Sequence, residues 1–155
     1  MTTDLSSPAV PAPAVWLGAA GVLPFAAAVL VLVAPSAGLS LVSPGLAASA
    51  LTAYGAVILS FLGGVHWGAA VTGPSQPGLT LRLSLSVLPS LVGWLALLLP
   101  HGLALPVLAG GFLAMLAVDL RAARLSEVPA WYPRLRIPLT LVVTALLLAG
   151  ASFLP

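Results

Sequence analysis

The sequence contains no cysteine, no lysine and few charged residues of any kind. Without cysteine there is no disulfide framework, thiolate metal site or thiol nucleophile, which excludes several classes of enzyme and of secreted scaffold. Charged residues make up only 5% of the chain, whereas soluble domains contain roughly 25%. Five arginines oppose three acids, so the net charge of +2 does not describe a basic surface, and we expect no nucleic-acid partner. Three acids and two histidines also supply little material for acid–base catalysis, so we expect no enzymatic activity.

Hydrophobic residues make up 61% of the 155-residue chain. A membrane-spanning helix needs about 20 mostly apolar residues to cross ~30 Å of hydrocarbon. Five stretches have that length, and they cover residues 15–34, 47–72, 81–99, 103–124 and 137–154. The links between these stretches are rich in the Pro and Gly that end helices. The five stretches lack the charged stripe at helical period that every helix of a soluble bundle needs.

The fold class predicted from these stretches is all-α, an integral membrane bundle of five transmembrane helices over residues 15–155. Residues 1–14 are rich in Pro, Ala and Ser and lack the basic region of a secretory signal, so we expect a flexible N-terminal tail.

The arginines predict the orientation of the bundle. Four of them flank the link between the fourth and fifth helices and the other begins the third helix; they are Arg121, Arg124, Arg134, Arg136 and Arg82. The positive-inside rule then places the N-terminus in the cytoplasm and the C-terminus outside. Trp131 and Tyr132 lie beside the same link and are predicted interfacial anchors in contact with the lipid bilayer. Arginine without lysine favours a GC-rich bacterial source, so the expected location is the bacterial inner membrane.

Small residues recur every four positions in the second predicted helix, at Ala56, Ser60, Gly64 and Gly68. Such a strip lets the backbone of another helix approach closely. We predict that this strip packs against a helix, either of the same chain or of another copy. In the second case the protein forms a homo-oligomer or joins a larger inner-membrane complex.

His66 lies in the same helix but points away from the strip, toward a second neighbour. An ionisable residue at membrane depth is a candidate site by default, as a haem or metal ligand, a proton relay or a hydrogen-bond donor to a ligand. We favour a structural imidazole that hydrogen-bonds to a neighbouring helix. His101 lies in the link on the opposite side, so the two histidines do not suit one metal or bis-histidine haem site.

A polar cluster is predicted at the cytoplasmic side, formed by His66, Arg82, Ser86, Asp119 and Arg136. Arg82 and Ser86 belong to a polar stripe on the third helix, where Pro89 removes a backbone donor and predicts a kink. This stripe suits either a structural kink or a hydrated cleft. A buried Asp119 is costly unless it is paired, and the candidates for its partner are Arg82 and Arg136. The cluster is either a structural lock, which we favour, or the floor of a cavity open to the cytoplasm.

Four stretches of the chain resemble the DUF3429 family, whose function is unknown. They are "LGAAGVLPF" (17–25), "YGAVILSFLGGVHWG" (54–68), "LSVLPSLVGW" (85–94) and "PAWYPRLRIPLT" (129–140). The second, with its histidine and tryptophan after a glycine pair, is the most specific. The resemblance implies a five-helix protein of a bacterial or mitochondrial inner membrane, and it supplies no catalytic residue, substrate or cofactor.

The function that these observations favour is that of a non-enzymatic structural or accessory subunit, which packs through its small-residue faces and holds no cofactor. The alternative is a small carrier or channel for a proton, an ion or a lipophilic molecule that uses the polar cluster. A haem or quinone at His66 is a further alternative. A polar cavity that continues toward mid-membrane would favour transport, whereas a dry, close-packed interior would favour assembly.

Overall fold

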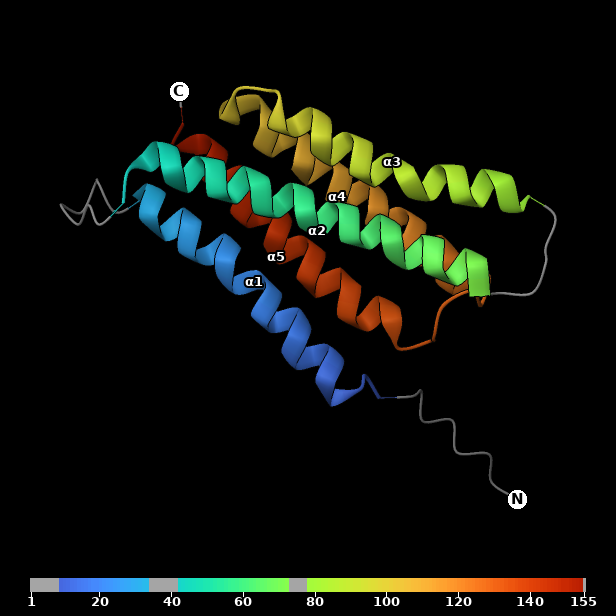
Figure 1. Cartoon of the computed structure of the whole chain (residues 1–155). Coiled ribbons are helices and arrows are strands. Elements are labelled where there is room, and N and C mark those ends of the chain that lie inside the picture. The colour runs from blue at the N-terminus through green and yellow to red at the C-terminus, as the bar shows by residue number, and fades with distance from the viewer. Residues whose placement is uncertain (1–8, 34–41, 73–77, 155) are drawn as a thin grey trace, which may run out of the picture.

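The structure is a computed structural model that describes residues 9–33, 42–72 and 78–154. Over these residues the chain forms five helices and no strand (Figure 1); they are α1 (Ala12–Val33), α2 (Pro44–Thr72), α3 (Leu79–Leu97), α4 (His101–Arg124) and α5 (Tyr132–Ser152). Each is long and apolar enough to cross a membrane. The predicted all-α fold with five spanning helices is confirmed.

All five helices begin two to five residues before the predicted positions, and α3 and α5 end two residues earlier than predicted. α1 begins at Ala12, so the last three residues of the predicted tail are helical, while residues 1–8 lie outside the described part of the chain. α5 begins at Tyr132 rather than at residue 137, because Pro133 occupies one of its first positions, where a helix tolerates proline. α3 runs through Pro89 without interruption, and the kink predicted there stays a prediction.

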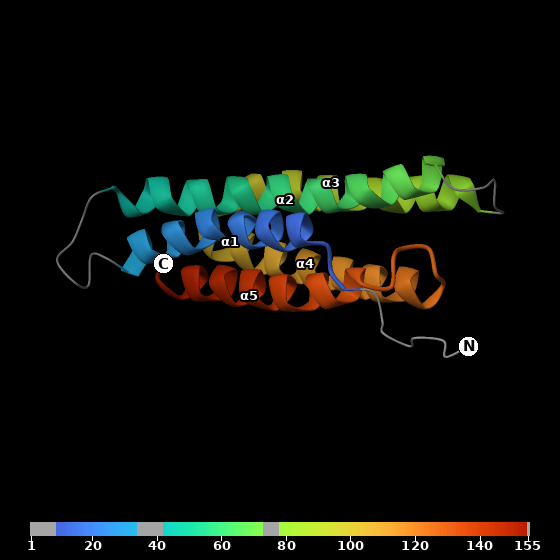
Figure 2. The same cartoon turned by 90° about the horizontal axis from the view of Figure 1, so that it is seen from below.

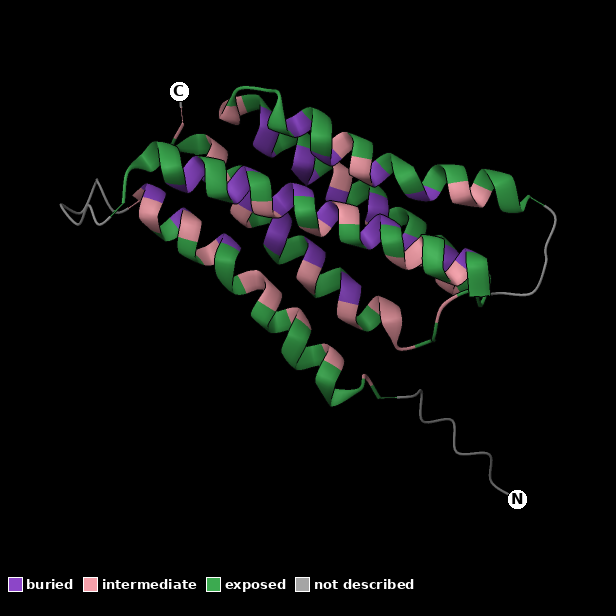
Figure 3. Ribbon diagram, viewed as in Figure 1, coloured by how far each residue is buried: buried purple, intermediate pink, exposed green. Residues whose placement is uncertain are grey.

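The helices form two layers, which Figure 2 shows most clearly: α2 and α3 lie in one and α4 and α5 in the other. α1 packs against α2 and α5. α2 contacts α1, α3 and α4, and α4 contacts α2, α3 and α5, so these two helices form the centre of the bundle. Their buried faces are visible in Figure 3, where α1 is mostly exposed along its first half. All the arginine-bearing helix ends lie at the same end of the bundle (Figure 1).

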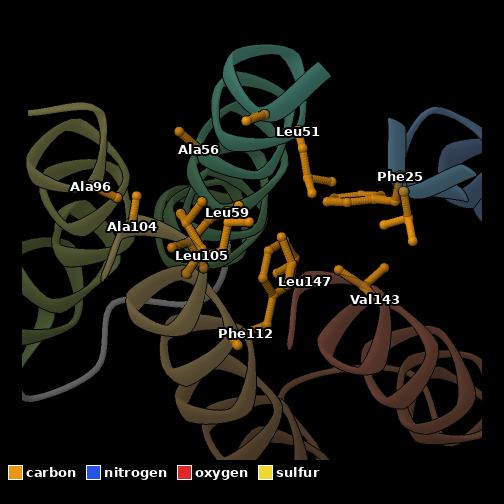
Figure 4. Close-up of a cluster of buried hydrophobic side chains, with 14 of the residues drawn as sticks. Phe25, Leu51, Ala56, Leu59, Ala96, Ala104, Leu105, Phe112, Val143 and Leu147 are labelled. Carbon is orange, nitrogen blue, oxygen red and sulfur yellow. The ribbon is translucent and has the colours of Figure 1, made fainter. Parts of the chain in front are cut away.

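The middle of the bundle is filled by apolar side chains (Figure 4). Phe25 anchors α1 here, with its ring centroid 4.9 Å from that of Tyr54 on α2 and 6.1 Å from that of Phe112 on α4. Leu59 and Leu147, from α2 and α5, are completely buried nearby. These side chains are apolar, so this part of the core offers few hydrogen-bonding groups to water at mid-membrane.

The contact between α2 and α3 is made by small residues. A Cβ added to Gly93 would lie 3.0 Å from the carbonyl oxygen of Ala56, and one added to Gly63 would collide with the carbonyl oxygen of Ser86. Between these two points the hydroxyls of Ser60 and Ser90 are 2.7 Å apart. The two backbones therefore approach as closely as their side chains allow, which is typical of helix pairs in membranes.

Candidate functional site

Three ionisable side chains from three helices meet inside the bundle, and we call them the buried triad: His66 of α2, Asp119 of α4 and Arg136 of α5. His66 Nε2 lies 2.8 Å from Asp119 Oδ1, and Arg136 Nε donates to Asp119 Oδ2 at 2.7 Å. Asp119 is 1% exposed and Arg136 7%. Each carboxylate oxygen therefore has its own donor in surroundings nearly free of solvent.

The three positions lie at the same depth because of where they stand in their helices. Asp119 precedes the end of α4 at Arg124, His66 precedes the end of α2 at Thr72, and Arg136 follows the start of α5 at Tyr132. At about 1.5 Å per residue, all three lie about 6–9 Å inside their helix ends.

The charges of the triad balance when the imidazole of His66 is neutral. An ionised carboxylate can only accept hydrogen bonds, so the proton between His66 and Asp119 belongs to His66 Nε2. A neutral imidazole then leaves one negative and one positive charge, Asp119 and Arg136, in direct contact. This is the arrangement that makes buried charges tolerable.

Two members of the predicted polar cluster lie outside the triad. Arg82 pairs instead with Glu127, with Nη2 3.2 Å from Oε2 and both side chains about one-third exposed or less. Ser86 donates to the carbonyl oxygen of Leu83 in its own helix. Of the two partners considered for Asp119, the structure therefore pairs it with Arg136.

Glu127 was missed from the sequence, and the turn that positions it explains why. The N–H of Glu127 bonds to Ala122 O at 2.9 Å and that of Ser126 to Ala123 O at 3.1 Å, which is the Schellman pattern at the end of α4. Ser126 adopts the left-handed conformation, with φ 56°. Glycine usually occupies that position. Because serine stands there instead, the sequence does not predict the turn that brings Glu127 to Arg82.

A cavity of about 560 Å³, which we call cavity A, lies between α2, α3 and α4 on one side of the triad. His66, Arg82, Ser86, Arg121 and Glu127 supply its polar lining. Leu59, Val92 and Gly111 line it at mid-helix. The polar groups are thus confined to the arginine-bearing end, and the deeper walls are apolar.

A second cavity of about 380 Å³, cavity B, lies on the other side of the triad between α1, α2 and α5. Arg136 and Thr140 line it among apolar residues. Arg136 Nη2, Thr140 Oγ1 and, one turn further along α5, Thr144 Oγ1 are buried without a hydrogen-bond partner in the described chain. Sequence reasoning missed both threonines, although the four-residue spacing of polar side chains in an apolar helix was a usable signal.

The predicted packing strip divides along α2. Ala56 and Ser60 contact α3, but Gly64 and Gly68 are exposed, and a Cβ added to either would meet nothing within 4 Å. Residues four apart advance about 40° around a helix at each step, because 3.6 residues make a turn. The strip therefore winds away from α3, and Gly63 takes the next contact position instead of Gly64. Gly64 and Gly68 stay a prediction for contact with another chain.

The remaining candidates lie near the helix ends. Trp131 and Tyr132 are half-buried, their ring centroids are 5.9 Å apart, and both line cavity B. They therefore face the bundle, and their role as interfacial anchors stays a prediction. His101 lies at the opposite end from His66, where its Nδ1 is 3.2 Å from Thr52 Oγ1 and its Nε2 3.3 Å from Ser49 Oγ. Thr52 already donates to Ala48 O, so its oxygen accepts from His101 Nδ1–H. No group of three metal-ligating side chains occurs among the described residues.

The part of the chain that contains the triad and the α2–α3 contact matches a known family. A family model described as "Protein of unknown function (DUF3429)" covers residues 10–152. The chain belongs to this family. Transmembrane protein 69 of Xenopus tropicalis is 41% identical over 137 residues, and that of Mus musculus 33% identical over 134 residues. Each match covers 85% of this chain but only 51% and 52% of those proteins, so the chain spans about half the length of the curated relatives it matches. No solved structure matches the chain.

The family membership and the five spanning helices agree with each other. This DUF3429 chain is a multi-pass membrane protein whose helices contact the lipid bilayer. The histidine of the most specific block, His66, is the member of the buried triad contributed by α2.

Proposed function

We propose that this DUF3429 protein is a non-enzymatic structural or accessory subunit of a membrane complex, without a resident cofactor. In this proposal it lies in the bacterial inner membrane with its N-terminus in the cytoplasm, because the arginines gather at one end of the bundle. Its role is to present a rigid helix face to another membrane helix.

The first support for this proposal is the way the interior is built. Asp119 is neutralised by Arg136 and hydrogen-bonded to His66, and beyond this level the central side chains are apolar, such as Leu147 and Leu59, which also lines cavity A. Cavity A is polar only at its arginine-bearing end. A bundle built in this way supports a scaffold better than a path for ions, which requires polar or hydrated groups along its length.

The observation that carries the proposal is the change of neighbours along α2. Ala56 and Ser60 show that the strip supports close approach of a helix, since α3 lies directly against them. Gly64 and Gly68 continue it on the outer face, with open space where their side chains would be. A helix of a second protein could approach there without displacing any side chain of this chain.

A pair of leucine substitutions tests the proposal. Gly64→Leu should leave the isolated protein stable, because the added side chain meets open space, but it should block a partner helix. Gly110→Leu is the matched control, since Gly110 is also an exposed mid-helix glycine with nothing within 4 Å of an added Cβ. Both variants and the wild type would be purified from native membranes in mild detergent, and the size of the complex and its melting temperature measured.

The expected result is loss of the larger species for Gly64→Leu alone, with all three melting temperatures similar. A complex that survives Gly64→Leu unchanged, or a wild type that runs as a single bare chain after chemical crosslinking in the native membrane, would refute the subunit proposal.

Cavity A favours a second candidate function, a small carrier. Its apolar walls and its charged mouth at Arg82, Arg121 and Glu127 suit a lipophilic or amphiphilic cargo. Proteoliposomes separate the two functions: a carrier shows flux that falls with His66→Ala, whereas a structural subunit shows no flux in either protein.

A further inference from the structure

Cavity B contains buried hydrogen-bonding groups that the fold does not use. Arg136 Nη2 and Thr140 Oγ1 have no hydrogen-bond partner in the described chain, although the residues are only 7% and 1% exposed. Both residues line the cavity. More than nine in ten buried polar groups in proteins are hydrogen-bonded, so two unpartnered groups in one cavity call for an explanation. Neither is needed by the triad, which uses Arg136 Nε.

The walls of cavity B and its opening define the kind of molecule that suits it. Apart from Arg136, Thr140 and Tyr132, the lining is almost entirely apolar, with contributions from α1, α2, α4 and α5. Leu17 of α1 lines the cavity and is 74% exposed, so the cavity opens beside α1 toward the surface that faces the bilayer. Its volume of about 380 Å³ lies within the range of small-molecule sites, roughly 300–1,000 Å³. A lipophilic molecule could enter from the membrane.

The charge of the site indicates which polar group the molecule presents. Arg136 is already neutralised by Asp119, so an anion in the cavity would bring an uncompensated negative charge. A neutral oxygen can accept from Arg136 Nη2–H and from the Thr140 hydroxyl without that cost. The two residues are one helical turn apart on the same face of α5, and both line cavity B, so one ligand oxygen can bridge the two side chains.

We propose that cavity B binds a neutral lipophilic molecule through carbonyl oxygen that accepts hydrogen bonds from Arg136 Nη2 and Thr140 Oγ1. Glycerolipid esters and isoprenoid quinones both carry this chemistry. The site does not depend on the proposed subunit role, since its polar groups, Arg136 and Thr140, belong to α5, whereas Gly64 belongs to α2 and does not line the cavity.

Two threonines on α5 provide the variant and its matched control. Thr140→Val removes the hydroxyl from the cavity with little change of shape. Thr144→Val removes an equally unpartnered, buried hydroxyl that does not line the cavity. Removing either unpartnered group should leave folding intact or raise the melting temperature, because a buried polar atom without a partner is unfavourable. Only Thr140→Val should weaken binding.

The experiment uses the full chain in phosphatidylcholine nanodiscs and two diazirine-labelled probes, a diacylglycerol and a short-chain benzoquinone. We expect saturable labelling that maps to α1, α2 and α5 around Arg136. The probe should bind Thr140→Val about three- to tenfold more weakly than the wild type, which corresponds to one lost hydrogen bond, and its affinity for Thr144→Val should be unchanged. The probe that labels saturably identifies the source, and lipid analysis of the purified protein checks it.

The outcomes against the proposal are equally definite. Labelling spread evenly along all lipid-facing helices would mean ordinary annular lipid. Equal affinities for the wild type, Thr140→Val and Thr144→Val would show that the Thr140 hydroxyl does not bind the probe. If neither probe labels saturably, the cavity binds no such molecule and the proposal is overturned; a higher melting temperature of both valine variants would then mean that these hydroxyls stay without a partner in the membrane.

Discussion

Replacing Asp119 by alanine is the most informative perturbation of this bundle. Asp119 contacts both other members of the buried triad, so its removal takes a hydrogen bond from His66 and the counter-ion from Arg136. Arg136 cannot lose its proton and has little access to water at 7% exposure. The variant therefore leaves a charge uncompensated inside the protein.

The expected cost follows from that burial. Breaking a buried ion pair by removing one partner costs about 3–5 kcal/mol, since the remaining charge stays desolvated. The lost hydrogen bond from His66 is part of this figure because the three groups act as one network. A cost in this range lowers the folding equilibrium constant by more than about a hundredfold. Arg124→Ala provides the comparison: Arg124 is exposed at the end of α4 and its stem can reach the headgroups, so its removal should cost less than about 0.5 kcal/mol.

Reversible unfolding in mixed micelles, followed by circular dichroism, measures both variants. A double variant adds a sharper test. Asp119→Leu combined with Arg136→Met replaces the pair by apolar side chains and should cost less than Asp119→Ala alone, because no charge is left buried. If Asp119→Ala and Arg124→Ala are equally tolerated, or if the double variant costs the sum of its single changes, Asp119 does not neutralise a buried charge on Arg136.

Three further predictions concern the packing and the turns. Gly63→Ala should destabilise the protein by about 1–3 kcal/mol, because its Cβ collides with a backbone oxygen of α3, whereas Gly64→Ala should change stability by less than about 1 kcal/mol; equal melting temperatures would contradict this contact. Ser126→Gly should stabilise by about 1 kcal/mol by relieving the left-handed conformation, and a lower melting temperature would argue against the Schellman turn. Glu127→Gln should cost less than about 1 kcal/mol, since its pair with Arg82 is partly exposed at 27% and 31%; a larger loss would mean that the pair closes the bundle.

The candidate site shows how far sequence reasoning reaches. That a buried aspartate needs a cation on another helix follows from the cost of burying a charge, and it reduces the possibilities for Asp119 to Arg82 and Arg136. The choice between them depends on how α3 and α5 are rotated about their axes. Thr140 and Thr144 were missed for a related reason, since threonine is ordinary in membrane helices and only the packing shows that these hydroxyls have no partner.

The sequence by itself determined that the helices lie in lipid, how many of them span the membrane, and which end of the bundle carries the arginines. These properties follow from the composition of the chain and from the length of each helix, which the rise of 1.5 Å per residue gives directly. Only the tertiary structure decided that Arg136 pairs with Asp119, that Gly63 rather than Gly64 meets α3, and that two cavities flank the triad. Neighbouring residues on a helix point about 100° apart, so a small rotation of one helix against another changes which residue makes the contact.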